Sequence, residues 1–409
     1  MTGPAATLQE GCRLCGEPLG SVLKRFGPLP VAGSYVQQDT PRTEALIPFT
    51  LMRCEACGLV QLQESLTADF YKDYRFIGGT STSYKDHLQA IAVRVAGCLR
   101  AGATVLEIGP GDGTLLEMLR SAGMQVGGFE PAIEPARAAC AKKLEVRNEP
   151  FGRDTARASP IQAADLVIIR HVLEHIDDFG TIFEGLERVT GSDTILLVEV
   201  PDLTSTLDGR LYSSFYHAHP CYFSIETLTR LLSRFGWRIT AAGIVDIFGG
   251  SILASAKRSG VASGAEREMT FGPDPKKATP GSLEAFLRNW QQTLDELRRF
   301  LEGLLRESLV VAGYGADERT TSVIGTAGLT PRHVRCLYDK NRALHLLAIP
   351  GARVPIRDPA RLLEDRPDVL VIFAQSHEEA IITEQERYRE TGGRFVTLRT
   401  RPPSFVGGS

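Results

Sequence analysis

Short apolar runs alternate with helix-like stretches through the middle of the chain. TVLEI at 104–108 is an apolar run of strand type, and a glycine turn leads from it into the helix-like stretch TLLEMLRSAG. QVGGF at 125–129 and ADLVIIR at 164–170 have the same strand character, and TILLVEVP at 194–201 is a further strand. Strands that alternate with helices predict a doubly wound, Rossmann-like α/β core, which we place at residues 76–257.

A second α/β pattern fills the C-terminal part of the chain. A long helix is predicted there, with one apolar face made of Leu283, Phe286, Leu287, Trp290, Leu294, Leu297 and Leu301. LVVAGYGADERTT then has the form of strand, glycine turn and helix, VRCLYDKN is a second strand that ends in Asp339, and DVLVIFAQ is a third. We therefore predict a second Rossmann-like α/β domain at 282–409, preceded by an exposed linker at 258–281 that is rich in glycine, proline and charge.

The overall composition is that of a globular protein with several domains. The chain has 409 residues, a formal charge of −3, 43% hydrophobic residues and 23% charged residues. This length suits two or three domains, and the charge lacks the basic excess that binding to a phosphate backbone requires. The N-terminus has no secretory pattern, and no segment approaches the roughly 18 apolar residues of a membrane span. We expect a cytoplasmic protein, monomeric and without nucleic-acid or membrane partners.

Four of the eight cysteines form two C-x-x-C pairs near the N-terminus. Each pair is followed by glycine, in CRLCG and CEACG, so the chain can turn tightly and aim two thiolates at one point. Two such turns predict a closed, structural zinc site in a module at residues 1–75, which is too small to be stable without the metal. The predicted ligands are Cys12, Cys15, Cys54 and Cys57. The alternatives are a redox pair and unligated core cysteines.

The turn after residues 104–108 has the composition of a ligand-binding loop. Gly109, Gly111 and Gly113 allow the backbone to pass close to a ligand at the carboxyl end of a strand, although a plain tight loop would have the same composition. Glu130 ends the next strand. Because a carboxylate offers two acceptor oxygens side by side, we predict that Glu130 binds both hydroxyls of a ribose; the alternative is a solvated loop carboxylate.

The glycine turn resembles that of the class I methyltransferases, which use S-adenosylmethionine. Glu107 to Gly113 match the pattern E-x-G-x-G-x-G, whereas a nicotinamide enzyme would more often show G-x-G-x-x-G. The resemblance implies that Glu107, the three glycines and Glu130 bind S-adenosylmethionine, in a doubly wound core.

HVLEH, from His171 to His175, also fits a pattern used by some zinc peptidases. That pattern requires a continuous helix, but this segment leaves the apolar strand DLVII, so we reject the metal interpretation. The segment lies where methyltransferases pass the cofactor. We therefore expect His171 to contact the cofactor and His175 to lie at the mouth of the cleft, where it is either functional or simply bonded to backbone.

The segment FYHAHPCYFS, residues 215–224, gathers histidines and aromatic residues just before a predicted helix. Ser224 caps this helix, and we expect an incomplete capping box because Thr227 replaces Glu or Gln at the third helical position. The loop resembles Y-H-E-H-x-x-Y-F-S of the sugar-nucleotide C-methyltransferases. GGSIL at 249–253, YGA at 314–316 and IPGARVPI at 349–356 extend the resemblance over nearly the whole chain, as does the four-cysteine module.

The resemblance implies methylation of a nucleotide-linked 4-keto-deoxysugar, at the carbon beside the ketone, in natural-product pathways such as antibiotic biosynthesis. Such a carbon must lose a proton, and a histidine near neutral pKa is a suitable base. His219 is the candidate base, and Tyr216 or His175 is the candidate donor to the enolate oxygen. The predicted substrate contacts are Tyr74, Phe76, His217, Tyr222, Tyr314, Arg319 and Asp339. Tyr74 and Phe76 alternatively pack between domains, and the histidine loop is alternatively a polar loop without catalysis.

Three departures from the family pattern leave other functions open. Ala218 stands in place of the glutamate between the histidines, Leu253 in place of an arginine, and Phe248 in place of a frequent histidine. These changes remove a carboxylate partner and an anion contact. The alternatives are a methyltransferase for another small acceptor, an oxidoreductase that uses the C-terminal glycine turn, and a noncatalytic ligand-binding relative.

Overall fold

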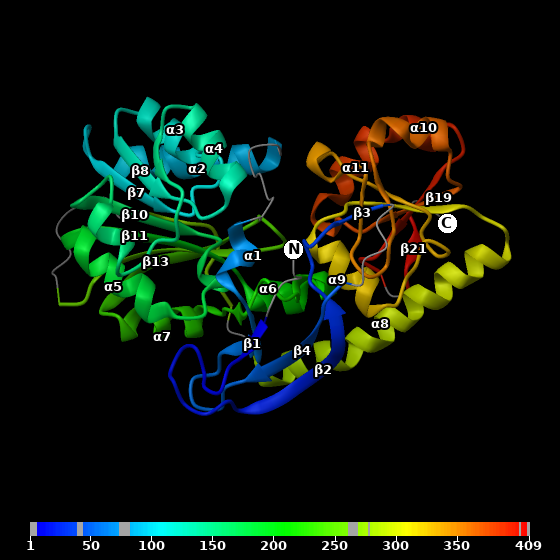
Figure 1. Cartoon of the computed structure of the whole chain (residues 1–409), viewed down its shortest axis with the longest axis horizontal. Helices are drawn as coiled ribbons and strands as arrows, with labels where there is room; N and C mark the ends of the chain where they lie inside the picture. Colours follow the sequence, from blue (N-terminus) through cyan, green and yellow to red (C-terminus); the bar gives the residue numbers. More distant parts are fainter. Residues whose placement is uncertain are drawn as a thin grey trace.

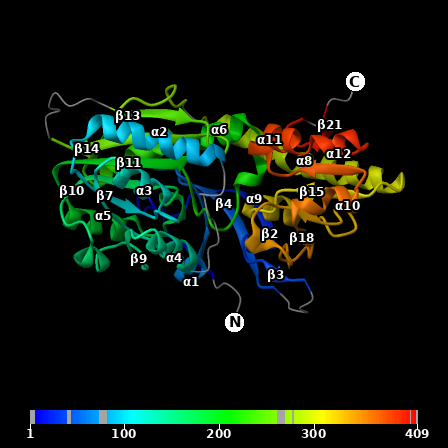
Figure 2. The same cartoon turned by 90° about the horizontal axis from the view of Figure 1, so that it is seen from above.

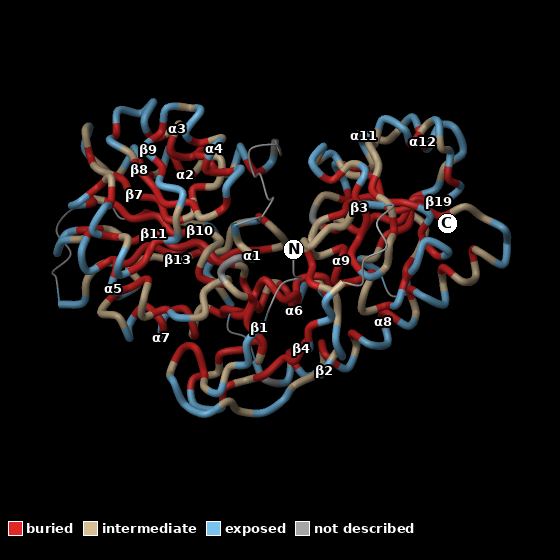
Figure 3. Tube along the Cα trace, in the orientation of Figure 1, coloured by how far each residue is buried: buried red, intermediate tan, exposed pale blue. Residues whose placement is uncertain are grey.

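The computed structural model describes residues 6–38, 44–72, 82–260, 269–276, 279–400 and 402–406. Two α/β lobes lie side by side, and a smaller β-rich part lies below and between them (Figure 1). The buried positions concentrate on the strands at the centre of each lobe, while the outer faces of the helices are exposed (Figure 3). The predicted fold class, an α/β core with a small cysteine-containing module and a second α/β part, agrees with this arrangement.

The α/β lobe in the middle of the chain is built on a seven-stranded sheet in the order β13-β14-β11-β10-β7-β8-β9. Its strands are β7 (Thr104–Ile108), β8 (Gln125–Phe129), β9 (Glu145–Arg147), β10 (Ala164–Arg170), β11 (Thr190–Pro201), β13 (Trp237–Val245) and β14 (Ser251–Arg258). β14 pairs antiparallel with β11 and β13, and the remaining pairs are parallel. The predicted strands at 104–108, 125–129 and 164–170 are confirmed.

Helices cover both faces of this sheet because successive strand residues point to opposite sides. Val105 packs with α2 (Thr82–Cys98) and α3 (Thr114–Ser121), whereas its neighbour Leu106 packs on the other face with α5 (Phe179–Val189) and α7 (Ile225–Arg234). Figure 2 shows α2 lying across the sheet. α4 (Ile133–Ala141) packs beside α3 at the β9 edge. The sheet is therefore doubly wound, as predicted.

The order in which successive strands are added to the sheet reverses at β7. The strand that follows β7 in the sequence, β8, lies on one side of it, and β10 lies on the other. In open α/β sheets this reversal leaves a crevice at the carboxyl ends of the strands, where ligands bind. The glycine turn after β7, Glu130 after β8 and the segment 171–176 after β10 all lie at this edge.

The N-terminal part is joined to both lobes by strand pairing. Its main sheet has the order β12-β5-β4-β2, with β2 (Ser21–Pro30), β4 (Leu46–Arg53), β5 (Val60–Leu62) and β12 (Cys221–Tyr222). β12 comes from the histidine loop of the core. β3 (Val36–Gln37) pairs with β17 (Leu347–Ala348) of the C-terminal lobe, and β1 (Ala6–Leu8) pairs with β6 (Glu64–Leu66). The short helix α1 (Ala68–Lys72) follows β6.

The C-terminal lobe contains a six-stranded sheet in the order β18-β16-β15-β19-β20-β21. Its strands are β15 (Val311–Tyr314), β16 (Leu337–Tyr338), β18 (Ile356–Arg357), β19 (Val369–Ile372), β20 (Arg394–Thr397) and β21 (Ser404–Phe405), of which only β21 pairs antiparallel among these described strands. Its helices are α9 (Glu318–Thr326), α10 (Leu362–Asp365), α11 (Glu378–Glu384) and α12 (Glu386–Glu390).

The long helix α8 (Pro280–Arg306) connects the lobes along the base of the molecule (Figure 1). All seven apolar positions predicted for its inner face are buried, and they share one core with Phe49 and Leu51 of the N-terminal sheet. The helix also packs near α6 (Leu203–Asp208) of the core. α8 is thus a shared wall of all three parts rather than an appendage of the C-terminal domain.

Two local predictions differ from the structure. The capping box of α7 is complete, because the Thr227 hydroxyl oxygen accepts a hydrogen bond from the Ser224 amide at 2.9 Å, the task that Glu or Gln usually performs. The predicted linker is not uniformly exposed: Met269 is buried in the core, and the Ile244 amide donates to the Pro273 carbonyl. Among the described residues, none of the helices combines the length and apolar character needed to cross a membrane.

Candidate active site

The four predicted zinc ligands meet at one point. The ligand atoms of Cys12, Cys15, Cys54 and Cys57 all lie within 4.8 Å of one another. The Sγ atoms of Cys12 and Cys57 are 3.5 Å apart, as are those of Cys15 and Cys54. Four thiolates placed about 2.3 Å from a tetrahedral zinc ion would have such a spacing, which is far longer than a disulfide bond. The cage therefore fits a structural zinc ion that all four thiolates hold.

One arginine ties this cage to the core. Arg13 lies inside the first cysteine turn, and its guanidinium is buried. It donates to Asp177 Oδ1 at 2.9 Å and to the Gln61 side chain at 3.2 Å. Asp177 also accepts from Ser65 Oγ at 2.7 Å. Because Asp177 directly follows the segment after β10, the cysteine turn fixes the position of that segment.

The glycine turn after β7 presents one open position. Gly109, Gly111 and Gly113 have φ values of 73°, 58° and 73°. A side chain at Gly109 would collide with Val172, and one at Gly113 would collide with Leu144, whereas a Cβ at Gly111 would meet nothing within 4 Å. Gly109 and Gly113 are thus required by packing, and Gly111 is the glycine that faces open space.

Glu130 lies directly across from Gly111. Its Oε2 accepts from the Gly111 amide and its Oε1 from the Ala132 amide, both at 2.9 Å. Burial raises the pKa of Glu130, and the two amides oppose this rise. A carboxylate has about four acceptor positions, so two remain for a pair of ligand hydroxyls. The turn and Glu130 therefore fit the ribose of an adenosine cofactor.

A buried network of charged side chains lies next to this edge of the sheet. Arg170 Nη2 donates to Glu107 Oε1 at 2.8 Å, and Arg170 Nη1 lies 3.7 Å from Glu199 Oε2. Glu107 and Glu199 are fully buried. Glu107, predicted to contact the cofactor, thus has its carboxylate directed at Arg170, and its contact with the cofactor stays a prediction. His87 Nε2 lies 2.7 Å from Glu199 Oε1.

His171 stands at the end of β10 in a strained backbone conformation, with φ 52°. Its Nδ1 is 3.3 Å from Glu174 Oε1, and its Nε2 is 3.7 Å from Glu199 Oε1. Although burial disfavours the charged ring, Glu199 and Glu174 raise the pKa of His171 to about 9. The ring is therefore a cation near neutral pH, at the edge where the cofactor is expected.

The histidine loop is wedged against the N-terminal sheet. β12 pairs with β5, and the Leu62 amide donates to the Pro220 carbonyl. His217 Nε2 lies 3.2 Å from the carbonyl oxygens of both Ile47 and Pro48. Burial lowers the pKa of His217, opposed by these carbonyls. His217 therefore anchors the loop, and its predicted contact with substrate stays a prediction.

His219, Tyr216 and His175 form one buried cluster. His219 Nε2 is 2.7 Å from Tyr216 Oη, and the rings of His175 and His219 meet edge to face at 4.7 Å. His175 Nδ1 lies 2.6 Å from the Ala218 carbonyl. Burial lowers the pKa of His219 well below its usual value, with His175 and Arg319 acting in the same direction, and burial raises the pKa of Tyr216 well above its usual value. Both groups are therefore neutral near pH 7, which is the state a base and a hydroxyl donor require.

Glu174 supplies a carboxylate to this cluster. One ligand atom each from Glu174, His175 and His219 lies within 4.8 Å of the others. Glu174 is buried, and its Oε2 has no hydrogen-bond partner among the described residues. The HVLEH segment itself is not a continuous helix, because only a single 3-10 turn, Leu173–His175, is formed. The expected absence of a peptidase-type helix is confirmed, yet its glutamate takes part in the site.

A small cavity lies beside His219. Its volume is about 10 Å³, and its lining includes Ser214, Thr206 and the guanidinium-bearing Arg319. A cavity of this size holds about one water molecule. A sugar-sized acceptor can reach His219 only when the lining side chains move apart.

Arg319 crosses from the C-terminal lobe to the core. Its Nη1 donates to the Phe248 carbonyl at 2.9 Å, and its guanidinium lies over the Phe248 ring, 5.6 Å from the centroid. Phe248 has a left-handed φ of 53° and packs edge to face against His171 at 4.9 Å. Phe248, the residue before the glycine pair, thus contacts both Arg319 of the C-terminal lobe and His171 at the end of β10.

The other predicted substrate residues have diverse positions. Tyr314 is buried in a hydrophobic cluster of the C-terminal sheet. Asp339 accepts from the amides of Ala316 and Asn341, both at 2.8 Å, which is the same arrangement that Glu130 has in the core. Tyr222 Oη bonds to the backbone of Tyr216. Tyr74 and Phe76 lie outside the described residues, and the roles of all these residues stay predictions.

Sequence reasoning missed three members of the site. Glu174 stands in HVLEH, but only the two histidines of this segment are predicted site residues. Arg170 and Glu199 stand at the ends of apolar strands, where an isolated charge can be a sign of a buried ion pair. Nothing local in the sequence indicates that these charges meet each other.

Three family models match consecutive parts of the chain. A zinc binding domain matches residues 12–70, a methyltransferase domain 82–242 and a C-methyltransferase C-terminal domain 246–398. C-methyltransferase NovU of Streptomyces niveus is 27% identical over 408 residues, which cover 96% of this chain and 96% of NovU.

Solved structures also match the chain. A SAM dependent methyltransferase from Archaeoglobus fulgidus is 19% identical, with a TM-score of 0.36, over 42% of this chain and 94% of that chain. Magnesium protoporphyrin IX methyltransferase from Synechocystis, with bound SAM, is 19% identical, with a TM-score of 0.33, over 43% and 79% of the respective chains.

Proposed function

Because the chain is a methyltransferase that combines the three domains of the C-methyltransferases, we propose that it methylates a carbon atom of a nucleotide-linked keto-deoxysugar through an enolate, in natural-product biosynthesis. The methyl donor is S-adenosylmethionine, which supplies an electrophilic methyl group when it is bound. The observation that carries the proposal is the neutral His219–Tyr216 pair, joined at 2.7 Å beside the carboxyl edge of the sheet.

The residues that hold the donor are those at the carboxyl ends of β7, β8 and β10. Gly111 offers an open approach, Glu130 keeps two acceptor positions for the ribose, and the His171 ring lies at the same edge. Glu107 supports these residues through its ion pair with Arg170, and Gly109 and Gly113 support them by close packing.

His219 acts as the base in this proposal. In the tautomer that carries its hydrogen on Nε2, Nε2 donates to Tyr216 Oη, and Nδ1 has the free lone pair. Nδ1 takes the proton from the carbon beside the ketone, and the electron pair of the broken C–H bond becomes the enolate. The Tyr216 hydroxyl hydrogen is not used in the bond to His219, so it can be donated to the enolate oxygen. The Glu174 carboxylate, within 4.8 Å, favours the charged ring that this transfer creates.

This arrangement supports enolate chemistry despite Ala218. Ala218 is buried among Val31, Ala32, Ile47 and Leu66, so a carboxylate at this position would lie in apolar surroundings. Glu174 provides a carboxylate from the neighbouring segment instead. The missing glutamate therefore does not by itself argue against the proposal.

A second candidate is methyl transfer to a different small acceptor. Leu253, at the position where the resemblance places an arginine, is fully buried in the apolar face shared with α2. Position 253 therefore lacks the guanidinium that would bind an anion. Arg319 instead lines the small cavity beside His219. A changed anion contact favours a changed acceptor.

The test is a methyl-transfer assay with a thymidine diphosphate 4-keto-deoxysugar, together with solvent deuterium exchange at the carbon beside the ketone. We expect the wild type to methylate this sugar and to catalyse exchange, and His219→Asn to lose at least about 100-fold in both. His333→Asn, in the C-terminal lobe, is the matched control and should retain both activities. Methylation without any loss in His219→Asn rejects the assigned base. Methylation of other acceptors but not of the nucleotide sugar supports the second candidate.

A further inference from the structure

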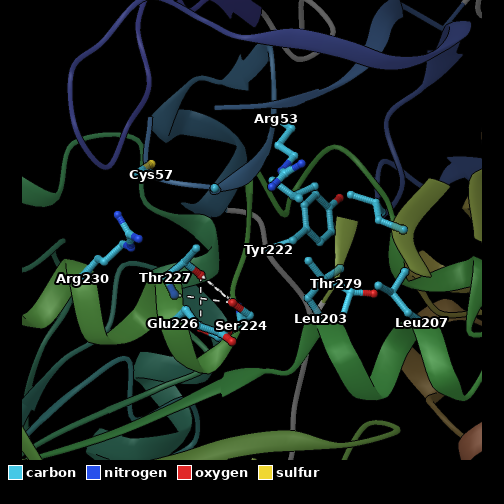
Figure 4. A pocket seen from close by; sticks show the side chains of 13 residues that line it. Arg53, Cys57, Leu203, Leu207, Tyr222, Ser224, Glu226, Thr227, Arg230 and Thr279 are labelled. Atoms are coloured by element: carbon cyan, nitrogen blue, oxygen red, sulfur yellow. Dashed lines mark hydrogen bonds between the residues drawn. The ribbon is translucent and has the colours of Figure 1, made fainter. Parts of the chain in front are cut away.

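A second pocket lies where all three parts of the molecule meet. It has a volume of about 180 Å³, and it is lined by Arg53 and Val60 of the N-terminal sheet, by Leu203 and Arg230 of the core and by Leu283 of α8. Figure 4 shows that Arg53, Leu203 and Arg230 reach the pocket from different elements. Its volume is below the about 300–1,000 Å³ of pockets for drug-sized molecules, so it suits a small ligand.

Two arginines give the pocket an excess of hydrogen-bond donors. The side chains of Arg53, at the end of β4, and Arg230, on α7, have no ion-pair or hydrogen-bond partner within the described ranges. Figure 4 shows Arg230 extending from its helix toward the N-terminal part and Arg53 lying near Tyr222. A guanidinium carries five N–H donors, which match the oxygens of a phosphate or carboxylate.

Two helix N-termini add positive charge to this pocket. α7 begins after Ser224 and α8 begins after Thr279, and both capping residues line the pocket. The helices have 10 and 27 residues. The Thr227 and Ser282 amides already donate to the capping hydroxyls, and Pro280 has no N–H, so the two ends contribute mainly their partial positive charge, which favours an anion. The arginines and the helix ends therefore have the same preference, from different elements.

The pocket also contains an acceptor that needs a donor. Glu226 lines it, and Glu226 Oε2 is buried without a hydrogen-bond partner among the described residues. A simple anion would leave this oxygen unsatisfied, whereas a ligand with hydroxyl groups can donate to it. The remaining wall is apolar, formed by leucines and the Tyr222 ring.

From these contacts we infer that the pocket is a second ligand site, separate from the methyl-transfer site, for a small hydroxylated phosphate of the sugar-phosphate class. The phosphate lies between Arg53 and Arg230, and a hydroxyl of the ligand donates to Glu226. This inference goes beyond the proposed function, because it requires neither the methyl donor nor the base.

The site is connected with the histidine loop through Tyr222. Tyr222 and Leu203 line both this pocket and the small cavity of His219. Tyr222 Oη accepts from the Tyr216 amide at 3.2 Å, and Tyr216 holds His219 at 2.7 Å. A ligand that packs on the Tyr222 ring therefore acts on the position of Tyr216, and its binding should change the rate of methyl transfer.

The experiment is isothermal titration calorimetry of the full chain with glucose 1-phosphate, inorganic phosphate and glucose as probes. We expect one saturable site for glucose 1-phosphate, weaker binding of inorganic phosphate and no binding of glucose. Arg53→Gln and Arg230→Gln should each weaken glucose 1-phosphate at least about tenfold, since each removes charged hydrogen bonds. Glu226→Gln should reduce the preference for the ester over inorganic phosphate. Arg238→Gln, an exposed arginine on β13, is the control and should bind like the wild type.

Two outcomes overturn the inference. One is the absence of saturable phosphate binding at millimolar concentrations, and the other is unchanged binding in both Arg53→Gln and Arg230→Gln. Thermal melting without ligand verifies that these variants are folded, and Arg230 is exposed on its helix, so its replacement leaves the core intact. Binding of S-adenosylhomocysteine is measured in the same variants. If S-adenosylhomocysteine does not bind to the wild type, the proposed function is refuted, whereas the inference about this pocket is not affected.

Discussion

The ribose role of Glu130 gives the sharpest test of the cofactor site. The change Glu130→Gln keeps the size of the side chain but replaces one acceptor oxygen by an NH₂ group. In the wild type each oxygen already accepts one backbone amide, from Gly111 and from Ala132, at 2.9 Å. The amide of glutamine can satisfy only one of them, and its NH₂ group cannot accept from a ribose hydroxyl.

The expected loss follows from these hydrogen bonds. A hydrogen bond to a charged group contributes about 1.5–3 kcal/mol. The loss of one such bond to the ribose corresponds to about a 10- to 150-fold increase in the Kd of S-adenosylhomocysteine. Because burial raises the pKa of Glu130, the wild type should itself lose affinity as the pH falls toward that raised value. Glu130→Gln should not show this pH dependence.

The assay is calorimetric titration of S-adenosylhomocysteine into the wild type, Glu130→Gln and the control Glu134→Gln. Glu134 is exposed at the start of α4 and pairs with Arg137, so its replacement should leave the Kd unchanged. A Kd for Glu130→Gln within twofold of the wild type would refute the reasoning. It would mean that Glu130 only braces the glycine turn.

Two other expectations concern stability and the metal. Despite burial, Glu199 and Glu174 raise the pKa of His171 from 6.5 to about 9. The contribution of His171 to folding stability is therefore fully present below about pH 6.5 and is lost as the pH rises through about 9. The free energy of unfolding, measured in urea, should fall by at most about 3 kcal/mol over this window, and by much less in His171→Asn. Removal of zinc with a chelator should release one metal ion per chain and abolish methyl transfer, because the cysteine cage positions Asp177 through Arg13 at 2.9 Å; full activity in metal-free protein would contradict this link.

The sequence predicted those features that depend on neighbours along the chain. The glycine turn, the strand ending in Glu130 and the apolar face of α8 were identified because alternation, glycine and helical spacing are local patterns. The two C-x-x-C turns also have local geometry, so their convergence on one metal followed from ligand number. The prediction of an incomplete capping box was wrong, also for a local reason, because the Thr227 hydroxyl can replace a carboxylate at short range.

The sequence by itself thus determined the order of strands and helices, the metal ligands and the edge of the sheet where chemistry is expected. Only the tertiary structure decided which charges meet. Glu174 joins His219, Arg319 reaches Phe248 from another lobe, and β12 pairs with a strand far away in the sequence. The physical reason is that local patterns fix backbone conformation, whereas the partner of a buried charge is set by how separate elements pack, which no short segment encodes.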